Sequence, residues 1–343
     1  MKENIKNLNL LISYWLLITT LLVASIIVVG GLTRLTDSGL SITRWDLFSG
    51  ILPPLNQNEW INYFELYKKI PEYQLINSNM TLDQFKIIFL WEYAHRLLGR
   101  IIGLFYFIPL IIFSVLGYLN KKNIFNYYLI LFLIVLQGVI GWYMVKSGLT
   151  ERTDVSHYRL SAHLTLAFII FILLFWNYLK LTKERIKIKI DKFISRLIKL
   201  FFLLIIFQIS WGALVSGLDA GKIYNTWPLM NGSFFPDDSS YEDLFKFSLL
   251  ENRSLLQFTH RMIAYFIFFI FIFIGILILK NDNLIYLRKI SLIIFSFLIF
   301  QIFLGVLTVT SGAEIIIASM HQIGSIILVG STLILVFQSS KIN

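Results

Sequence analysis

The chain has 343 residues, of which 57% are hydrophobic and only 15% are charged, and its mean hydropathy is +0.73. A water-soluble domain of this composition would lack the polar residues to cover its surface, so we predict an integral membrane protein. The net charge of +10 lies in short blocks between apolar runs, which excludes a nucleic-acid-binding face, and the absence of cysteine excludes disulfides, thiolate ligands and iron–sulfur clusters.

Eight apolar runs reach the length of about 20 residues that a helix needs to cross the hydrocarbon core of a bilayer. They are residues 10–31, 86–116, 125–145, 158–179, 197–217, 256–279, 290–310 and 316–337. The first run is longer than the core of a signal peptide and no small-residue cleavage site follows it, so we expect it to be the first span. The sequence therefore predicts an all-α, multi-pass fold of eight transmembrane helices.

Lysine and arginine residues gather in alternate connections between the runs, and the positive-inside rule makes that side cytoplasmic. They are Lys2, Lys6, Lys121, Lys122, the block 180–199, Arg288, Lys289 and Lys341. Both termini are therefore expected in the cytoplasm. The opposite side carries two long polar connections, 32–85 and 218–255, whose prolines and tryptophans predict short amphipathic pieces over the outer face.

The two halves of the chain repeat each other. Six residues recur 182 positions later, namely Gly30, Leu32, Asp37, Gly39, Trp45 and Pro54, which match Gly212, Leu214, Asp219, Gly221, Trp227 and Pro236. Further along, Gln137 and Gly141 match Gln301 and Gly305. We predict two repeated four-helix bundles: an N-terminal half at 1–180, a cytoplasmic linker at 181–196 and a C-terminal half at 197–343.

Four of the five histidines occupy matching places near the outer ends of the spans. His95 corresponds to His260, and His163 corresponds to His321. Two imidazoles that face each other across a helix bundle can bind a heme iron from both sides, so each half is predicted to hold one heme. Zinc would need three or four converging donors, and the alternative without a metal is a hydrogen bond to a neighbouring helix. His157 has no counterpart and is expected at the surface.

Arginines beside these histidines are candidates for pairing with heme propionates. Arg96 and Arg261 directly follow His95 and His260. Arg100 and Arg159 lie near the outer edge, where they could equally extend into the lipid headgroups. Gly138, Gly141 and Gly305 are expected to let helices approach closely, without chemical duties.

One acidic position distinguishes the two halves. Glu92 lies three residues before His95, and Gln257 occupies the matching place before His260. An amide keeps the size of the side chain but cannot titrate, so the carboxylate predicts that the N-terminal half is the reactive one. The alternative is that Glu92 only forms an ion pair with Arg96, four residues later.

Several long motifs resemble those of the heme A synthase family, in the branch that lacks an outer-loop cysteine pair. They cover nearly the whole chain and read GGLTRLTDSGLSITRW, IPEYQ, FKIIFLWEYAHRLLGR, YRLSAHL, GLDAGKIYNTWPLMNG, QFTHRMIAY and HQIG. Glu314, before the last motif, departs from the apolar or proline-containing turn expected there. The resemblance implies oxidation of a porphyrin methyl group of heme O to a formyl group through successive hydroxylations, which gives heme A for terminal oxidases.

The resemblance also implies a role for each histidine pair. His260 and His321 would bind the iron of a permanent heme b, while His95 and His163 would bind substrate heme O, with Glu92 taking part in catalysis. It further implies a bacterial inner (plasma) membrane location, with the heme sites near the periplasmic face. A heme O synthase, an electron donor and a second copy of the chain are the expected partners beside membrane lipids.

Two other functions explain four histidines. A diheme b-type cytochrome that exchanges electrons with quinone would need no difference between Glu92 and Gln257. A heme transporter would need weak, exchangeable ligands, and duplicated transporters often break their helices at the midplane, whereas these histidines lie near one face.

Overall fold

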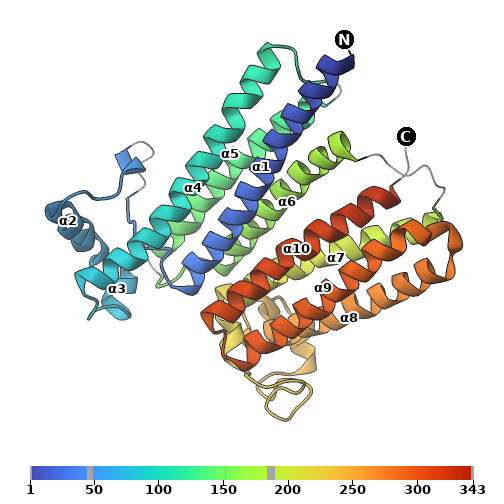
Figure 1. The fold of residues 1–343 in the computed structure, drawn as a ribbon. Helices are drawn as coiled ribbons and strands as arrows, with labels where there is room; N and C mark the ends of the chain where they lie inside the picture. The colour runs from blue at the N-terminus through green and yellow to red at the C-terminus, as the bar shows by residue number, and fades with distance from the viewer. Residues whose placement is uncertain (1, 45–48, 122, 151, 184–189, 341–343) are drawn as a thin grey trace. The chain divides into compact units, whose positions relative to one another are not determined.

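The computed structural model describes residues 2–44, 49–121, 123–150, 152–183 and 190–340 (Figure 1). Within these ranges, eight helices are long and apolar enough to cross a membrane, which confirms the all-α class and the number of spans. They are α1 (Lys2–Leu35), α4 (Leu82–Val115), α5 (Ile124–Gly148), α6 (His157–Thr182), α7 (Lys192–Gly217), α8 (Arg253–Lys280), α9 (Ile285–Thr310) and α10 (Ile315–Ser339). Trp45, Lys122, Lys341 and residues 184–189 of the predicted linker lie outside the described residues.

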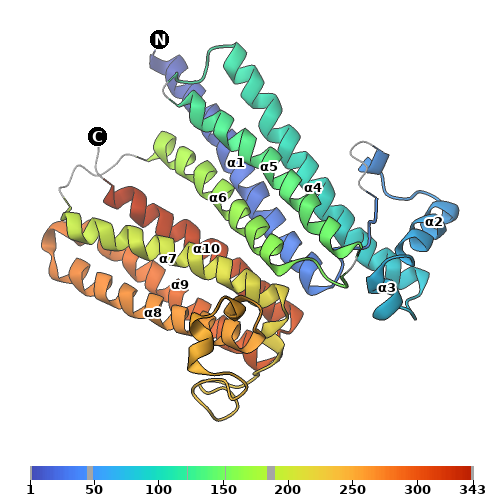
Figure 2. The ribbon, with the colours of Figure 1, turned by 180° about the vertical axis from the view of Figure 1, so that it is seen from behind.

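The chain divides into two compact units, Met1–Leu174 and Phe175–Asn343. In the first unit α4 packs against both α1 and α5 (Figures 1 and 2). In the second unit α7 and α9 each contact both α8 and α10, so the four helices form a closed ring. Many large apolar side chains remain exposed on the helices, as expected for surfaces that meet lipid.

An aromatic cluster joins three helices of the first unit. Trp15 of α1 stacks on Tyr106 of α4 with ring centres 4.8 Å apart, and its indole Nε1 donates to the carbonyl of Phe105 at 3.2 Å. The Tyr106 hydroxyl in turn donates to the carbonyl of Tyr127 on α5 at 2.9 Å. Both Tyr106 and Tyr127 are buried, so these bonds satisfy polar groups that lipid could not.

The long connections fold into short helices, as predicted. In the first unit they are α2 (Gln57–Tyr67) and α3 (Pro71–Leu75), which Figure 1 shows at one end of α4. These helices pack with parts of α4 around a buried cluster, the loop cluster, made of Leu40, Ile42, Phe64, Tyr67, Ile70, Phe85, Phe89 and Val155. In the second unit the long connection, described throughout from residue 218 to 252, contains the short 3₁₀ helices η2 (Ala220–Lys222), η3 (Tyr241–Phe245) and η4 (Phe247–Leu250).

Matching residues of the two halves share an unusual backbone geometry. Asp37 follows α1 with a φ of 47°, and Asp219 follows α7 with a φ of 53°. Aspartate tolerates this left-handed region better than most residues because its short side chain bonds locally. The chain therefore leaves the first helix of each unit through the same kind of turn.

Glu314 has a local structural role that explains its departure from the family motif. Its carboxylate accepts hydrogen bonds from the backbone N–H groups of Ile316 at 3.3 Å and Ile317 at 3.1 Å, at the first turn of α10. A side-chain acceptor at this position satisfies donors that have no partner within the helix. Glu314 thus caps the helix that carries His321.

Glu72 of α3 is a buried carboxyl group in the first long connection. It is 5% exposed, and no hydrogen-bond partner for its Oε2 is found among the described residues. Burial raises the pKa of Glu72 to about 8; Asp37, Glu92 and Asp154 raise it further, while a hydrogen bond with Tyr67 opposes the rise. The folded connection therefore keeps a proton that the unfolded chain loses above its ordinary pKa of 4.5.

The protonation of Glu72 predicts a pH-dependent connection. Its stabilising contribution is complete below about pH 4.5 and is lost as the pH rises through about 8. Raising the pH from about 6 to about 9 should therefore speed proteolytic cleavage within residues 57–77 several-fold. The protease should cleave Glu72→Gln slowly at both pH values. Glu65→Gln changes an exposed carboxylate, so its cleavage should depend on pH as in the unchanged protein. An unaltered pH dependence in Glu72→Gln would contradict this assignment.

Candidate functional site

Each of the four repeated histidines packs its ring against a glycine of a neighbouring helix. The pairs are Gly30–His95, Gly141–His163, Gly212–His260 and Gly305–His321. A Cβ atom at any of these glycines would stand between 2.9 and 3.1 Å from the facing ring, closer than van der Waals contact allows. These glycines make room for the imidazoles, so the close helix approach predicted at Gly141 and Gly305 is confirmed, and the neighbouring group is a histidine ring in each case.

Gly138 behaves differently from the other glycines. A Cβ atom there would meet nothing within 4 Å in the described part of the chain. The prediction of a close helix contact at Gly138 was therefore wrong, because its side of α5 faces open space.

His95 and His163 face each other within the first unit. Their ring centres lie 6.4 Å apart, and the ring planes are inclined by 65°. Two imidazoles that bind one metal ion from opposite sides have ring centres about 6 Å apart, since each metal–nitrogen bond is about 2.1 Å and the ring centre lies about 1 Å further. The structure thus brings together a pair that the sequence assigned to one site.

Glutamine side chains tie three of these histidines to neighbouring helices. The Nε2 atoms of Gln137, Gln208 and Gln301 donate to the backbone carbonyls of His163, His260 and His321 at 3.0, 2.8 and 2.8 Å. The sequence repeat contained Gln137 and Gln301 but gave no role to their amides. Their spacing of four residues before the histidine-facing glycine was the signal that could have revealed it.

Glu92 uses both of its carboxylate oxygens in hydrogen bonds. It is 3% exposed, and Oε2 accepts from the Ser41 hydroxyl and the Ile42 N–H, both at 2.7 Å. Oε1 accepts from Arg96 Nη2 at 2.6 Å and Nε at 3.0 Å. The ion pair considered as an alternative from sequence is therefore present, and it connects α4 to the chain that follows α1.

Gln257 and Arg261 make the corresponding connection in the second unit. Gln257 Nε2 and Arg261 Nη2 both donate to the carbonyl of Tyr224, at 3.1 and 3.0 Å. Tyr224 is the repeat counterpart of Ile42, so both units fix the same loop position from the helix that carries the first histidine. Arg261 is 8% exposed, and its Nε and Nη1 have no hydrogen-bond partner among the described residues.

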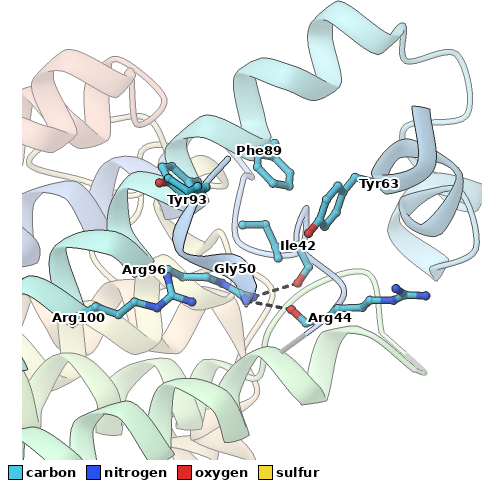
Figure 3. Close-up of a pocket in the computed structure, with 9 residues that line it drawn as sticks. Ile42, Arg44, Gly50, Tyr63, Phe89, Tyr93, Arg96 and Arg100 are labelled. Carbon is cyan, nitrogen blue, oxygen red and sulfur yellow. Dashed lines mark hydrogen bonds between the residues drawn. The ribbon is translucent and has the colours of Figure 1, made fainter. Parts of the chain in front are cut away.

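A pocket lies beside Arg96 in the first unit (Figure 3). Its lining consists of Ile42, Arg44, Gly50, Leu52, Tyr63, Phe89, Tyr93, Arg96 and Arg100. Arg96 donates to the carbonyls of Ile42 and Arg44, while the Arg44 side chain extends away from it. Guanidinium groups next to aromatic rings favour a carboxylate or another planar anion.

His157 is buried and does not lie at the surface. It is the first residue of α6, is only 1% exposed and packs on the Tyr158 ring with centres 4.0 Å apart. The surface prediction was wrong because the preceding connection, through Val155, joins the loop cluster and covers the start of α6. Arg159 donates to the carbonyl of Tyr143 at 2.7 Å and lies over its ring.

Comparison with known proteins identifies the family. The family model described as a cytochrome oxidase assembly protein matches residues 13–333. A heme A synthase of Pelagibacter ubique (strain HTCC1062) is 51% identical over 333 residues, which cover 95% of this chain and 96% of that protein. This chain belongs to the heme A synthase family. Heme A synthases of Rickettsia bellii (strain OSU 85-389) and Caulobacter vibrioides are 42% and 41% identical, each over 92% of this chain and over 94% and 92% of the relatives.

The histidine surroundings in this heme A synthase family member fit an iron porphyrin. In the described residues, no three His, Cys, Asp or Glu side chains gather in an arrangement that could hold a single metal ion. Nδ1 of His163, His260 and His321 is buried and has no hydrogen-bond partner within the same described ranges. The facing rings of His95 and His163, the unpartnered nitrogens of three histidines, and the unused donors of the buried Arg261 guanidinium would fit a heme iron and its carboxylates.

The Glu92–Arg96 ion pair should stabilise the first unit strongly because both side chains are largely buried. Arg96→Ala leaves a buried carboxylate with only Ser41 and Ile42 as partners, and it should cost about 3–5 kcal/mol of unfolding free energy. Adding Glu92→Gln should recover part of this loss, since no buried charge remains. Thermal unfolding of the purified variants measures both effects.

Arg34→Ala is the matched control for this ion pair. It breaks a pair with Asp37, whose side chain is 62% exposed, and should cost about 1 kcal/mol or less. Equal losses in Arg96→Ala and Arg34→Ala would show that burial adds nothing to the Glu92 pair.

Proposed function

We propose that the chain oxidises heme O to heme A at the site formed by His95, His163 and Glu92. The reaction converts a methyl substituent of the porphyrin into a formyl group through successive hydroxylations, so that one oxygen atom is added and two hydrogen atoms are removed overall. The observation that carries the proposal is the facing pair of imidazoles 6.4 Å apart, in a chain related along almost its full length to heme A synthases.

The second unit is proposed to hold a permanent heme b on His260 and His321. Gly212 and Gly305 leave room for the two rings, and glutamine amides fix the backbone at both histidines. Arg261 offers unused donors to a propionate. When bound, heme b supplies a one-electron carrier, while the protein residues hold its position.

In the first unit, His95 and His163 are proposed to bind the iron of the substrate heme, and Arg96 to supply positive charge near a propionate. Glu92 is proposed to hold or pass a proton at Oε2, the oxygen bonded to Ser41. A serine hydroxyl both donates and accepts, so it can relay a proton from this carboxylate. Gln257, at the matching position of the second unit, has an amide in place of the carboxyl group and cannot hold or pass a proton in this way.

The location and partners follow from the charge pattern and the family. We propose a bacterial inner membrane protein with both termini in the cytoplasm and the heme sites near the periplasmic face. Its proposed partners are a heme O synthase that supplies the substrate, an electron donor, membrane lipids and a second copy of the chain.

Pigment extraction tests the function directly. The purified protein, expressed with a supply of heme O, should yield heme b together with heme A and its hydroxylated precursor, separated by chromatography and identified by mass. A diheme cytochrome would yield heme b alone, and this result would overturn the proposal.

The two histidine pairs should respond differently to substitution. His260→Ala should lose most of the heme b, since one of the two histidines that would hold it is gone. His95→Ala should abolish heme A formation and leave heme b in place. The extracted pigments of both variants measure this division.

Two outcomes would contradict the assigned roles. Full heme b content in His260→Ala would remove that histidine from the cofactor site. Unchanged heme A formation in His95→Ala would remove it from the reactive site.

Glu92→Gln copies the amide found in the second half. If Glu92 transfers a proton, heme A formation should fall by about 10²-fold or more, and the hydroxylated precursor should accumulate. Thermal unfolding provides the control, because a stalled product profile in a stably folded variant separates chemistry from stability. Normal turnover would restrict Glu92 to its structural bonds with Ser41, Ile42 and Arg96.

A further inference from the structure

Three of the four repeated histidines accept a glutamine amide bond at their backbone carbonyl, and no such bond to His95 is found among the described residues. Gln137, Gln208 and Gln301 each stand four residues before the glycine that faces a histidine ring. In α1 the residue four positions before Gly30 is Ile26, the repeat counterpart of Gln208. An isoleucine side chain has no hydrogen-bond donor, so this position cannot bond the carbonyl of His95.

Ile26 nevertheless points toward the helix that carries His95. Its Cδ1 lies 3.6 Å from the position that a Cβ of Gly99 would take, and Gly99 follows His95 by one helical turn. The contact between α1 and α4 at this level is therefore apolar. Ile26 therefore gives α4 packing contact at this level but no hydrogen bond to the backbone at His95.

The His95 ring also has a different orientation from the other three. The atom nearest to the Cβ position of Gly30 is His95 Nε2, at 2.9 Å. At Gly141, Gly212 and Gly305 the nearest atom is Cε1 of the facing histidine. His95 thus differs from the other three histidines in two ways: no glutamine bonds its backbone carbonyl in the described residues, and its ring turns Nε2 rather than Cε1 toward the facing glycine.

The helix around His95 is bonded instead to the loop after α1. Glu92 and Arg96, on either side of His95, bond Ser41, Ile42 and the carbonyl of Arg44. A displacement of this loop would therefore move the backbone at His95, while Gln137 holds the backbone at His163. The two histidines therefore differ in what fixes their backbone, which is a glutamine amide on a neighbouring helix at His163 and the loop contacts of Glu92 and Arg96 at His95.

We propose that Ile26, by withholding an amide bond, makes His95 the more readily exchanged of the two histidines that would hold the substrate heme, and so favours uptake of heme O and release of heme A. His163 would be the more firmly held of the two, because Gln137 bonds its backbone carbonyl. A substrate site must release its product, whereas a permanent cofactor site must not, and both histidines of the second unit have glutamine ties. The inference rests on the proposed function, since it takes heme O to bind His95 and His163.

The test compares heme release from the intact protein loaded with both pigments. An excess of apomyoglobin collects released heme, and chromatography separates heme A and heme O from heme b, so each site reports separately. Ile26→Gln supplies the missing amide and should slow release of heme A and heme O about fivefold, the factor that one net hydrogen bond provides. Release of heme b should not change. Ile26→Leu is the matched control and should release heme at the original rate.

The reciprocal variant tests the same idea in the second unit. Gln208→Ile removes the tie to His260 and should speed heme b release about fivefold, without altering release of heme A and heme O. It remains informative if Ile26→Gln does not fold. Unchanged heme b release from Gln208→Ile, or equal effects of Ile26→Gln and Ile26→Leu, would overturn the inference.

The outcomes separate this inference from the function on which it rests. A purified protein that never contains heme O or heme A contradicts the proposed function itself. A protein that contains them, but releases them at one rate in Ile26→Gln and in the original chain, contradicts only the role of Ile26.

Discussion

The contact between an imidazole ring and the glycine facing it is the constraint on which both histidine pairs depend. A histidine in the interior of a helix bundle needs space beside a neighbouring backbone, and any Cβ atom at Gly30, Gly141, Gly212 or Gly305 would fill that space. The glycines thereby let the imidazole ring of a histidine fit between two adjacent helices. The same glycine–histidine contact occurs four times, twice in each half of the chain.

Hydrogen bonds from the histidine-bearing helices to the loops form a second shared feature. In the first unit Glu92 and Arg96 hold Ile42, and in the second unit Gln257 and Arg261 hold its counterpart Tyr224. These bonds satisfy the backbone N–H and carbonyl of Ile42 and the backbone carbonyl of Tyr224, both in the loop that follows the first helix of the unit. They also make the position of the first histidine in each unit depend on the loop that covers it.

Besides their long connections, the halves differ at two positions beside the histidine-bearing helices. The first half has Glu92 where the second has Gln257, so only the first half has a carboxyl group at this position. The first half has Ile26 where the second has Gln208, so only the second half has an amide hydrogen-bond donor there. Both differences fall in the unit assigned to substrate heme. Under the proposed function, these two substitutions would distinguish the unit that processes substrate heme from the unit that retains its heme.

Sequence alone determined the eight spans and predicted which histidines pair, because long apolar runs are local signals and a repeat is visible by comparing the chain with itself. The tertiary structure decided the rest: the ring contacts of Gly141 and Gly305, the amide ties of the glutamines, the four bonds of Glu92 and the burial of His157. Each of these features is a contact between residues of different helices or loops. Hydropathy and residue spacing do not specify such contacts, since they are set by side-chain packing between segments far apart in the chain.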